Sequence, residues 1–345
     1  MMGGLVETWY LKSAVGDVDR TPPPEGLPFV LEPGGPGEVR GRAFGGPVVV
    51  AMGVFDGLHV GHRRVFEQAC LVARDRNLPC AVLTFVEHPR TVLHPDRPVP
   101  LLTPWPEKRE SLAEAGIDRV VAAHFTPAFA ELSPEEFVRG ILVERLDARH
   151  LVVGFNFRFG HRGAGSPEML QQMAGEFGFG LDVIPPFELS GLVVSSSQIR
   201  ELLASGKVRE AGELLGGPYR LAGEVINGDA RARKLGFPTA NLRVDERKLL
   251  PAYGVYVGVA RWPGGRRRCV VNIGIRPTFD PPQLQVEAHL LDFEGDLYGQ
   301  TVTLELETYL RPERAFRSVN ELIDQIHQDV QSARSSSGIA APAEA

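Results

Sequence analysis

The chain of 345 residues is long enough for two domains of ordinary size. Its 37 basic and 43 acidic residues give a net charge of −6, which argues against a nucleic-acid-binding protein, because such proteins present a basic surface. Cys70, Cys80 and Cys269 are too few and too scattered for a disulfide framework or a zinc cluster, and they fit a reducing, cytoplasmic location. No export signal opens the chain and no apolar run approaches the length of about 18 residues typical of a membrane-spanning helix, so we expect neither export nor membrane insertion.

Residues 1–46 carry the weakest signals, and we expect them to form a partly irregular N-terminal arm. Val6 to Lys12 has the composition of an edge strand, whereas Thr21 to Pro47 is dense in proline and glycine and is typical of a loop. We assign no chemistry to this segment.

A strand, a glycine-rich turn and a helix start follow directly. Val48 to Met52 is a continuous apolar run of the kind buried in parallel sheets, and glycines stand at positions 53, 57 and 61 before a helical pattern begins. His59 and His62 lie three residues apart where that helix begins, so both imidazoles are expected beside free backbone amides, which suits a polyphosphate. Two alternatives remain: ordinary capping histidines, or a metal site, for which the neighbouring sequence offers no third ligand.

Alternating strands and helices continue to about residue 216 and predict βαβ units with a parallel sheet. Further strands are expected at Cys80 to Phe85, Val120 to Ala123 and Leu151 to Gly154, with a capped helix start at Ser133. His88 and the loop of Asn156, Phe157 and Arg158 follow two of these strands, where ligands of open α/β sheets bind. The loop is equally typical of simple packing with solvated arginines.

The segment Ser195-Ser196-Ser197 with Arg200 begins another helix. One serine there is most simply a helix cap, but three hydroxyls and a guanidinium also suit a terminal phosphate. After Gly216-Gly217 the character changes to short strands rich in valine, tyrosine and threonine, which predicts a small antiparallel barrel closed by a helix from Val319 to Val330. Between its first strands, Thr239 and Asn241 offer oxygen ligands of the kind that Mg²⁺ prefers, although the motif alone could be a turn.

The glycine-histidine stretch G-V-F-D-G-L-H-V-G-H of residues 53–62 resembles the signature of the nucleotidylyltransferase superfamily. It is most similar to the FMN adenylyltransferase (FAD synthetase) module of bacterial bifunctional riboflavin kinase/FAD synthetases. The resemblance implies that His59 and His62 contact ATP phosphates and stabilise the transition state. It implies ATP and phosphate binding by Gly53, Phe55, Asp56, Gly61, Ser195, Ser196, Ser197 and Arg200, and a flavin and adenine region at His88, Asn156, Phe157 and Arg158. Asn156 stands where many members carry aspartate.

The string L-G-F-P-T-A-N-L of residues 235–242 resembles the riboflavin kinase motif that binds Mg-ATP. The resemblance implies ATP-Mg binding by Arg233, Gly236, Pro238, Thr239 and Asn241, with Mg²⁺ near Thr239 and Asn241, and it makes Glu287 the catalytic base. Ala232 stands where glycine is usual. Arg311, Arg314 and Phe316 match a late segment of the kinase, whose role we expect to be packing near the flavin.

The whole pattern implies a Rossmann-like nucleotidylyltransferase domain followed by a riboflavin kinase barrel. We expect an arm at 1–46, an adenylyltransferase at 47–216, a kinase at 217–330 and a flexible tail at 331–345. The expected enzyme phosphorylates riboflavin with ATP to FMN, then adenylylates FMN to FAD, with Mg²⁺ at both sites, as a cytoplasmic monomer or weak homo-oligomer. Two rivals are a non-catalytic flavin or nucleotide sensor on a decayed kinase, and a nucleotidylyltransferase for another phosphate, such as a pantetheine phosphate.

Overall fold

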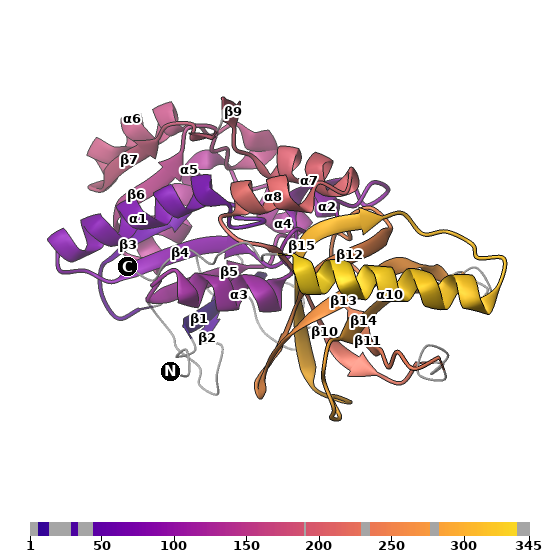
Figure 1. Cartoon of the computed structure of the whole chain (residues 1–345). Helices are drawn as coiled ribbons and strands as arrows, with labels where there is room; N and C mark the ends of the chain where they lie inside the picture. The colour runs from indigo at the N-terminus through magenta and orange to yellow at the C-terminus, as the bar shows by residue number, and fades with distance from the viewer. Residues whose placement is uncertain are drawn as a thin grey trace, which may run out of the picture. The chain divides into compact units, whose positions relative to one another are not determined.

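The computed structural model describes residues 6–13, 29–33, 44–189, 191–228, 235–276 and 283–336. It divides the chain into two compact units, Met1–Val194 and Ser195–Ala345, and each is described by itself (Figure 1). None of the described helices is both long enough and apolar enough to cross a membrane.

The first unit is built on one seven-stranded sheet in the order β2-β1-β5-β4-β3-β6-β7. Its strands are β1 Glu7–Ser13, β2 Phe29–Pro33, β3 Val48–Met52, β4 Cys80–Phe85, β5 Arg119–Ala123, β6 Ala148–Gly154 and β7 Gly180–Ile184. All neighbours are parallel except the antiparallel pair β1 and β2, so the prediction of a parallel sheet is confirmed.

Helices cover both faces of this sheet, as the continuous burial of β3 requires. They are α1 Val60–Asp75, α2 Pro89–Leu93, α3 Trp105–Glu114, α4 Pro127–Ala130, α5 Pro134–Glu136, the π-helical segment Phe137–Arg145, the 3₁₀ turn His161–Gly163 and α6 Pro167–Phe177. One core joins the sheet to α1 and α3, and the other joins it to the π-helical segment and α6. A short hairpin, β8 Glu188–Leu189 and β9 Leu192–Val193, completes the unit.

The N-terminal segment differs from the sequence expectation in two ways. β1 is an interior strand, because it pairs with β2 on one side and β5 on the other, and Trp9 and Leu11 are buried. Phe29–Pro33 is a strand where a loop was expected. The reason is that both strands draw their stability from the sheet, and Glu7 pairs with Arg119, far along the chain.

The second unit is a closed antiparallel barrel with helices, as the sequence predicts. Its elements are α7 Ser196–Ala204, α8 Val208–Leu215, β10 Tyr219–Ile226, β11 Ala240–Val244, β12 Gly254–Trp262, β13 Gly265–Arg276, β14 Gln283–Leu290, β15 Thr301–Arg311 and α10 Val319–Ser335. The strand order is β10-β11-β14-β13-β12-β15, and α10 packs along β12 and β13 (Figure 1).

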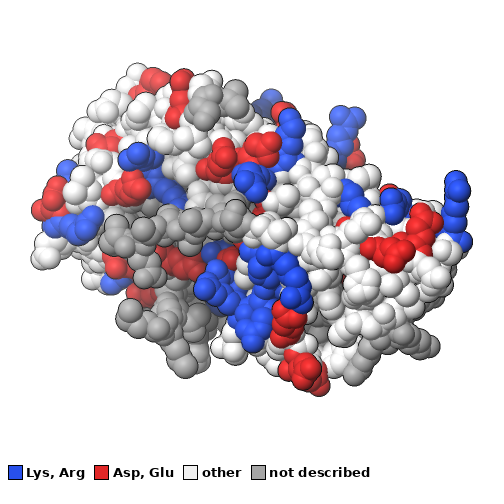
Figure 2. All heavy atoms as spheres, in the orientation of Figure 1, with Lys and Arg blue, Asp and Glu red and all other residues white. Residues whose placement is uncertain are grey.

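Helices α7 and α8 belong to this second unit, whereas the sequence analysis assigned them to the first domain. Their packing explains why they belong to the second unit. α8 lies against β10 and β15, and the Leu203 carbonyl at the end of α7 accepts a hydrogen bond of 2.9 Å from the Ala252 amide. On the face drawn in Figure 2, acidic and basic side chains occur in small groups of both signs, with one contiguous basic group near the centre of the view.

Candidate active sites

The turn between β3 and α1 has an unusual backbone. Phe55 and Leu58 adopt positive φ angles of 47° and 41°, and Gly57 adopts 91°. A Cβ atom on Gly53 would lie 2.8 Å from the Phe55 ring, so only glycine fits there. Residues other than glycine are strained at positive φ and keep this conformation only where surrounding contacts hold them. Such strained residues are common in functional turns.

This turn delivers two stacked imidazoles to the N-terminus of α1. His59 is the N-cap, and its Nδ1 accepts a hydrogen bond of 3.3 Å from the His62 amide. The two rings stack with centroids 3.6 Å apart and an interplanar angle of 18°, and the Phe55 ring meets His62 edge-on. A Cβ on Gly61 would approach the His59 ring to 3.2 Å, so the glycine leaves room for it.

Both histidines are neutral near pH 7. Burial lowers the pKa of His59 to about 4, although the Asp56 carboxylate acts in the opposite direction. Burial also lowers the pKa of His62 well below its usual range, and the charges of His59 and Lys108 add to that effect. The Nδ1 atom of His62 is buried with no hydrogen-bond partner among the described residues, which is unusual for a buried polar atom and marks this site as one where a partner is missing.

Asp56 and Lys108 make buried hydrogen bonds that hold the turn between β3 and α1 in place. The Asp56 carboxylate accepts hydrogen bonds from the amides of Leu102 (3.1 Å) and Thr103 (2.9 Å), and it is almost fully buried. The Lys108 ammonium, also buried, donates to the Val54 carbonyl (2.9 Å) and the Phe85 carbonyl (3.1 Å). Burial lowers the pKa of Lys108 to about 8, while Asp56 limits the shift.

Lys108 was not assigned a role by sequence reasoning. The only available signal was its place four residues before Leu112 on the buried face of α3, where a lysine is rarely fully buried unless it is paired. Its ammonium ties the turn after β3 to the end of β4, so it fixes two neighbouring strand ends at once.

The remaining predicted residues of the first unit follow the carboxyl ends of its strands. His88, after β4, caps α2 by accepting a hydrogen bond of 3.2 Å from the Arg90 amide. After β6, Asn156 and Arg158 are exposed, and Phe157 stacks on Phe159 with centroids 5.7 Å apart. Because β3, β4 and β6 are parallel neighbours, these groups share one edge of the sheet with the histidine turn.

The three serines begin α7 in the second unit. Ser195 is the N-cap, and its Oγ accepts a hydrogen bond of 3.3 Å from the Gln198 amide, which agrees with the capping interpretation. Ser196 and Ser197 lie on the first turn of this helix, and Arg200 is its fifth residue.

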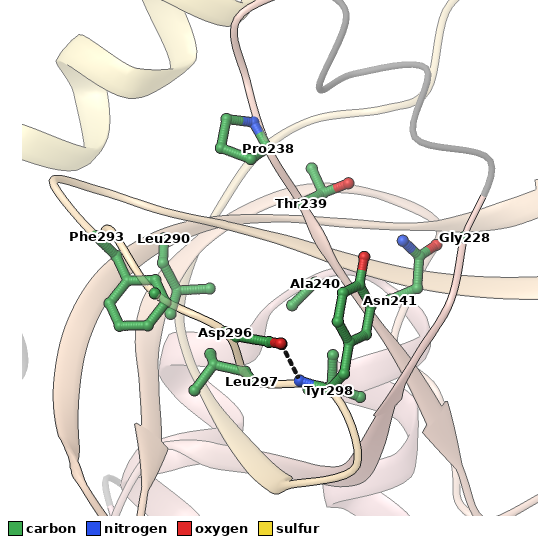
Figure 3. Close-up of a pocket in the computed structure, with 12 residues that line it drawn as sticks. Gly228, Pro238, Thr239, Ala240, Asn241, Leu290, Phe293, Asp296, Leu297 and Tyr298 are labelled. Carbon is green, nitrogen blue, oxygen red and sulfur yellow. Dashed lines mark hydrogen bonds between the residues drawn. The ribbon is translucent and has the colours of Figure 1, made fainter.

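A cavity of about 250 Å³ lies beside the predicted kinase motif in the second unit (Figure 3). Its lining includes Pro238, Thr239 and Asn241 from the motif, together with Asp296 and Tyr298 from the segment before β15. The Asn241 side chain lies against Gly228, where a Cβ would clash with the Asn241 amide. Gly236, two residues before the cavity-lining Pro238, adopts a positive φ of 92°. Arg233 lies outside the described residues.

Glu287 lies on the strand next to this motif. It pairs across β14 and β11 with Asn241, and across β14 and β13 with Asn272, so the three side chains share one face of the barrel wall. That face is the outer one, because the neighbouring Val286 and Ala288 are buried in the interior. The structure therefore brings Glu287 beside Asn241, although Glu287 does not line the cavity itself.

The late segment fastens the C-terminal helix. Arg311 on β15 donates through Nε (3.1 Å) and Nη2 (2.7 Å) to the buried Asp329 carboxylate of α10. Arg314 lies over the Phe316 ring at 4.7 Å. The Arg311–Asp329 ion pair holds α10 against β15, whereas the Arg314–Phe316 contact lies within the segment before α10.

No cluster of three or more potential metal-ligating side chains occurs in the described parts of the chain. The interpretation of the two histidines as a metal site therefore gains no third ligand from those parts. The stacked pair instead resembles a site for an anionic ligand at a helix N-terminus.

Comparisons with known proteins match both units. Residues 43–198 match the family model described as FAD synthetase, and residues 215–337 match the one described as riboflavin kinase. A Listeria monocytogenes protein named bifunctional riboflavin kinase/FMN adenylyltransferase is 39% identical over 288 residues, covering 83% of this chain and 91% of that protein. A Bacillus subtilis protein of the same name is 37% identical over 290 residues, with 83% and 91% covered.

A solved structure extends this likeness to the fold. The crystal structure named as a macrolide-efflux protein from Streptococcus pneumoniae is 34% identical, has a TM-score of 0.77, and covers 84% of this chain and 95% of its own. The chain therefore belongs to the family of bifunctional riboflavin kinase/FMN adenylyltransferases, enzymes that phosphorylate riboflavin with ATP to FMN and then transfer AMP from ATP to FMN, releasing pyrophosphate and giving FAD.

Proposed function

We propose that the first unit carries out adenylyl transfer with His59 and His62 as donors to the ATP phosphates. The observation that carries this assignment is the buried, stacked imidazole pair at the N-terminus of α1, with a His62 nitrogen that has no partner in the described residues. An FMN phosphate oxygen attacks the α-phosphorus of ATP as the bond to the bridging oxygen breaks, and pyrophosphate leaves. Because the nucleophile is already an anion, no protein base is needed, and catalysis is positioning plus charge stabilisation.

The neutral state of both imidazoles defines what they do. Two neutral rings bind an incoming polyanion through hydrogen bonds, and the anion itself then favours protonation of a ring. Any positive charge would thus appear when the substrate is bound, at the time when charge develops on the departing pyrophosphate.

Lys108 is a positioning residue in this proposal. Its two hydrogen bonds fix the strand ends from which the histidine turn and the His88 segment begin. Asp56 holds the turn through the amides of Leu102 and Thr103, which supports a structural rather than a phosphate-contacting role for its carboxylate.

The other binding residues remain assigned by proposal. Gly53, Phe55 and Gly61 shape the turn for the phosphates, and Ser195, Ser196, Ser197 and Arg200 hold the terminal phosphate. His88, Asn156, Phe157 and Arg158 face the flavin and adenine, an assignment supported by their shared place at the carboxyl edge of the sheet.

In the second unit, Glu287 is the base of riboflavin phosphorylation. It removes the proton from the primary hydroxyl of riboflavin while that oxygen attacks the γ-phosphorus of ATP, and ADP leaves. Its position beside Asn241, in the register of β11 and β14, supports this role. Arg233, Gly236 and Pro238 belong to the ATP-binding segment in the same proposal.

The residues of the cavity suit a hard cation. Thr239 and Asn241 line the same cavity, and a hydroxyl and an amide oxygen are donors that suit Mg²⁺. We assign Mg²⁺ binding to them. When bound, the ion would supply positive charge that offsets the negative charge developing during phosphoryl transfer.

We retain a module limit near residue 216, supported by the riboflavin kinase match that begins at residue 215. The strands β1 and β2 then belong to the first module. The proposed state is a cytoplasmic monomer or weak homo-oligomer, and the scarcity of cysteine supports a reducing compartment.

One experiment separates the two active sites. Riboflavin, FMN and FAD are resolved by chromatography after incubation with Mg-ATP, for the wild-type chain, His62→Ala and Glu287→Gln. We expect His62→Ala to lower FAD formation about 100- to 1,000-fold while FMN accumulates. Glu287→Gln should lower FMN formation by at least about 100-fold and leave FAD synthesis from supplied FMN intact.

Matched controls are the exposed residues His94 and Glu294. His94→Ala and Glu294→Gln should behave as wild type in both reactions. If His62→Ala still makes FAD at the wild-type rate, the assignment of His62 is wrong. If Glu287→Gln still makes FMN at the wild-type rate, the assignment of Glu287 is wrong.

A further inference from the structure

Two cysteines of the first unit lie together, away from the histidine turn. Cys70 is on α1 and Cys80 opens β4, and their sulfur atoms are 3.1 Å apart. Both are free thiols, Cys70 partly exposed and Cys80 buried. The third cysteine, Cys269, is buried in the barrel.

The surroundings make the two thiols unequal. The hydrogen bond between the sulfurs lowers the pKa of Cys70, because the Cys80 thiol can donate to the Cys70 thiolate; Arg74 adds to the effect, whereas burial and Asp118 oppose it. The same hydrogen bond and burial raise the pKa of Cys80. Burial raises the pKa of Cys269 to about 12. Cys70 is therefore the accessible nucleophile, and Cys80 is its partner.

The backbone around the pair is well held. The Cys80 amide donates to the Asp118 carboxylate (2.9 Å), and the Arg74 Nε donates to the Cys70 carbonyl (3.2 Å). Closing a disulfide requires the sulfurs to move together by only about 1 Å, to a bond of about 2.05 Å.

We propose that Cys70 and Cys80 form an oxidation site that closes to a disulfide between α1 and β4 by exchange with small-molecule disulfides. The Cys70 thiolate attacks one sulfur of the reagent RSSR, forms a mixed disulfide and expels RS⁻. Cys80 then loses its proton, attacks the Cys70 sulfur and expels the second RS⁻. In total, two protein thiols and RSSR give one protein disulfide and two RSH.

This crosslink fits the native arrangement, because α1 and β4 already pack together in one core. It also restricts the unfolded chain across a short loop, so the oxidised first unit should be more stable than the reduced one. The expected rise in its thermal midpoint is on the order of 5 to 10 °C. The inference is independent of the roles assigned to the catalytic residues.

The test uses the full chain, with oxidised glutathione as the reagent. After alkylation of free thiols and digestion with trypsin, mass spectrometry looks for residues 65–74 joined to residues 77–90. We expect this linked pair in the wild type and in Cys269→Ser, and no such pair in Cys70→Ser or Cys80→Ala. Cys269 should be alkylated in every protein that retains it. Calorimetry of the oxidised and reduced protein then measures the midpoint of the first unit, with Cys70→Ser as control.

Each result decides the matter. The linked peptides together with a higher midpoint, absent in Cys70→Ser, establish the site. A lasting glutathione adduct on Cys70 without the link, no reaction at either thiol, or a link that leaves or lowers the midpoint would overturn the inference.

Discussion

Replacing Lys108 by methionine should change how the stability of the first unit depends on pH. Burial lowers the pKa of Lys108 from 10.5 to about 8 in the folded protein. In the unfolded chain the lysine keeps its ordinary pKa, so between these two values the unfolded state binds one more proton than the folded state. Stability therefore rises with pH across this window, by about 1.4 kcal/mol per pH unit and about 3 kcal/mol in total.

The measurement is the free energy of unfolding of the first unit, from urea titrations between pH 7.5 and 10. Trp9 and Trp105 lie in that unit and Trp262 lies in the barrel, so Trp262→Phe makes tryptophan fluorescence report the first unit. In this background, Lys108→Met should lose the rise contributed by the lysine, while Lys207→Met, at an exposed position, should keep it. Equal pH dependence in the Lys108→Met protein and its parent would show that the ammonium is not buried as the structure places it.

Two further substitutions test the packing around the sites. Gly53→Ala places a Cβ against the Phe55 ring, and we expect the rate of adenylyl transfer to fall about 10- to 100-fold with the rate of riboflavin phosphorylation unchanged. Gly46→Ala is the control, because Gly46 has open space around it, and it should leave both rates unchanged. Normal FAD synthesis by Gly53→Ala would contradict the tight turn. Arg311→Met leaves the Asp329 carboxylate buried without its guanidinium partner, so chemical denaturation should show that the free energy of unfolding of the barrel falls by about 3 to 5 kcal/mol. A fall of less than about 1 kcal/mol would mean that this ion pair does not hold the helix.

The features that sequence predicted well depend on short-range signals. The apolar run Val48–Met52 and the glycines after it specify a buried strand and a tight turn within a few residues, and the structure has both. The capping box predicted at Ser133 is present for the same reason, because its hydrogen bonds connect residues only three positions apart. The barrel was also predicted from successive segments rich in valine, tyrosine and threonine that are separated by turns, although β13 and β15 are longer than the short strands expected.

The features that sequence did not predict depend on distant partners. β1 becomes an interior strand only through β2 and β5. β11 was not among the predicted strands, because its pairing with β14 is not visible in its own five residues. Lys108 is buried because two carbonyls from separate strand ends converge on it, and a local pattern cannot reveal such convergence.

The place of β1 bears on how the adenylyltransferase half can be isolated. The FAD synthetase match begins at residue 43, so a fragment cut at that limit would lack both β1 and β2. It would leave the row of β5 backbone amides and carbonyls that β1 normally occupies open to solvent and to other copies, and it would uncover the apolar surface under Trp9 and Leu11. Precipitation of such a fragment would therefore reflect the loss of β1 and β2. It would not show that the adenylyltransferase module is inactive.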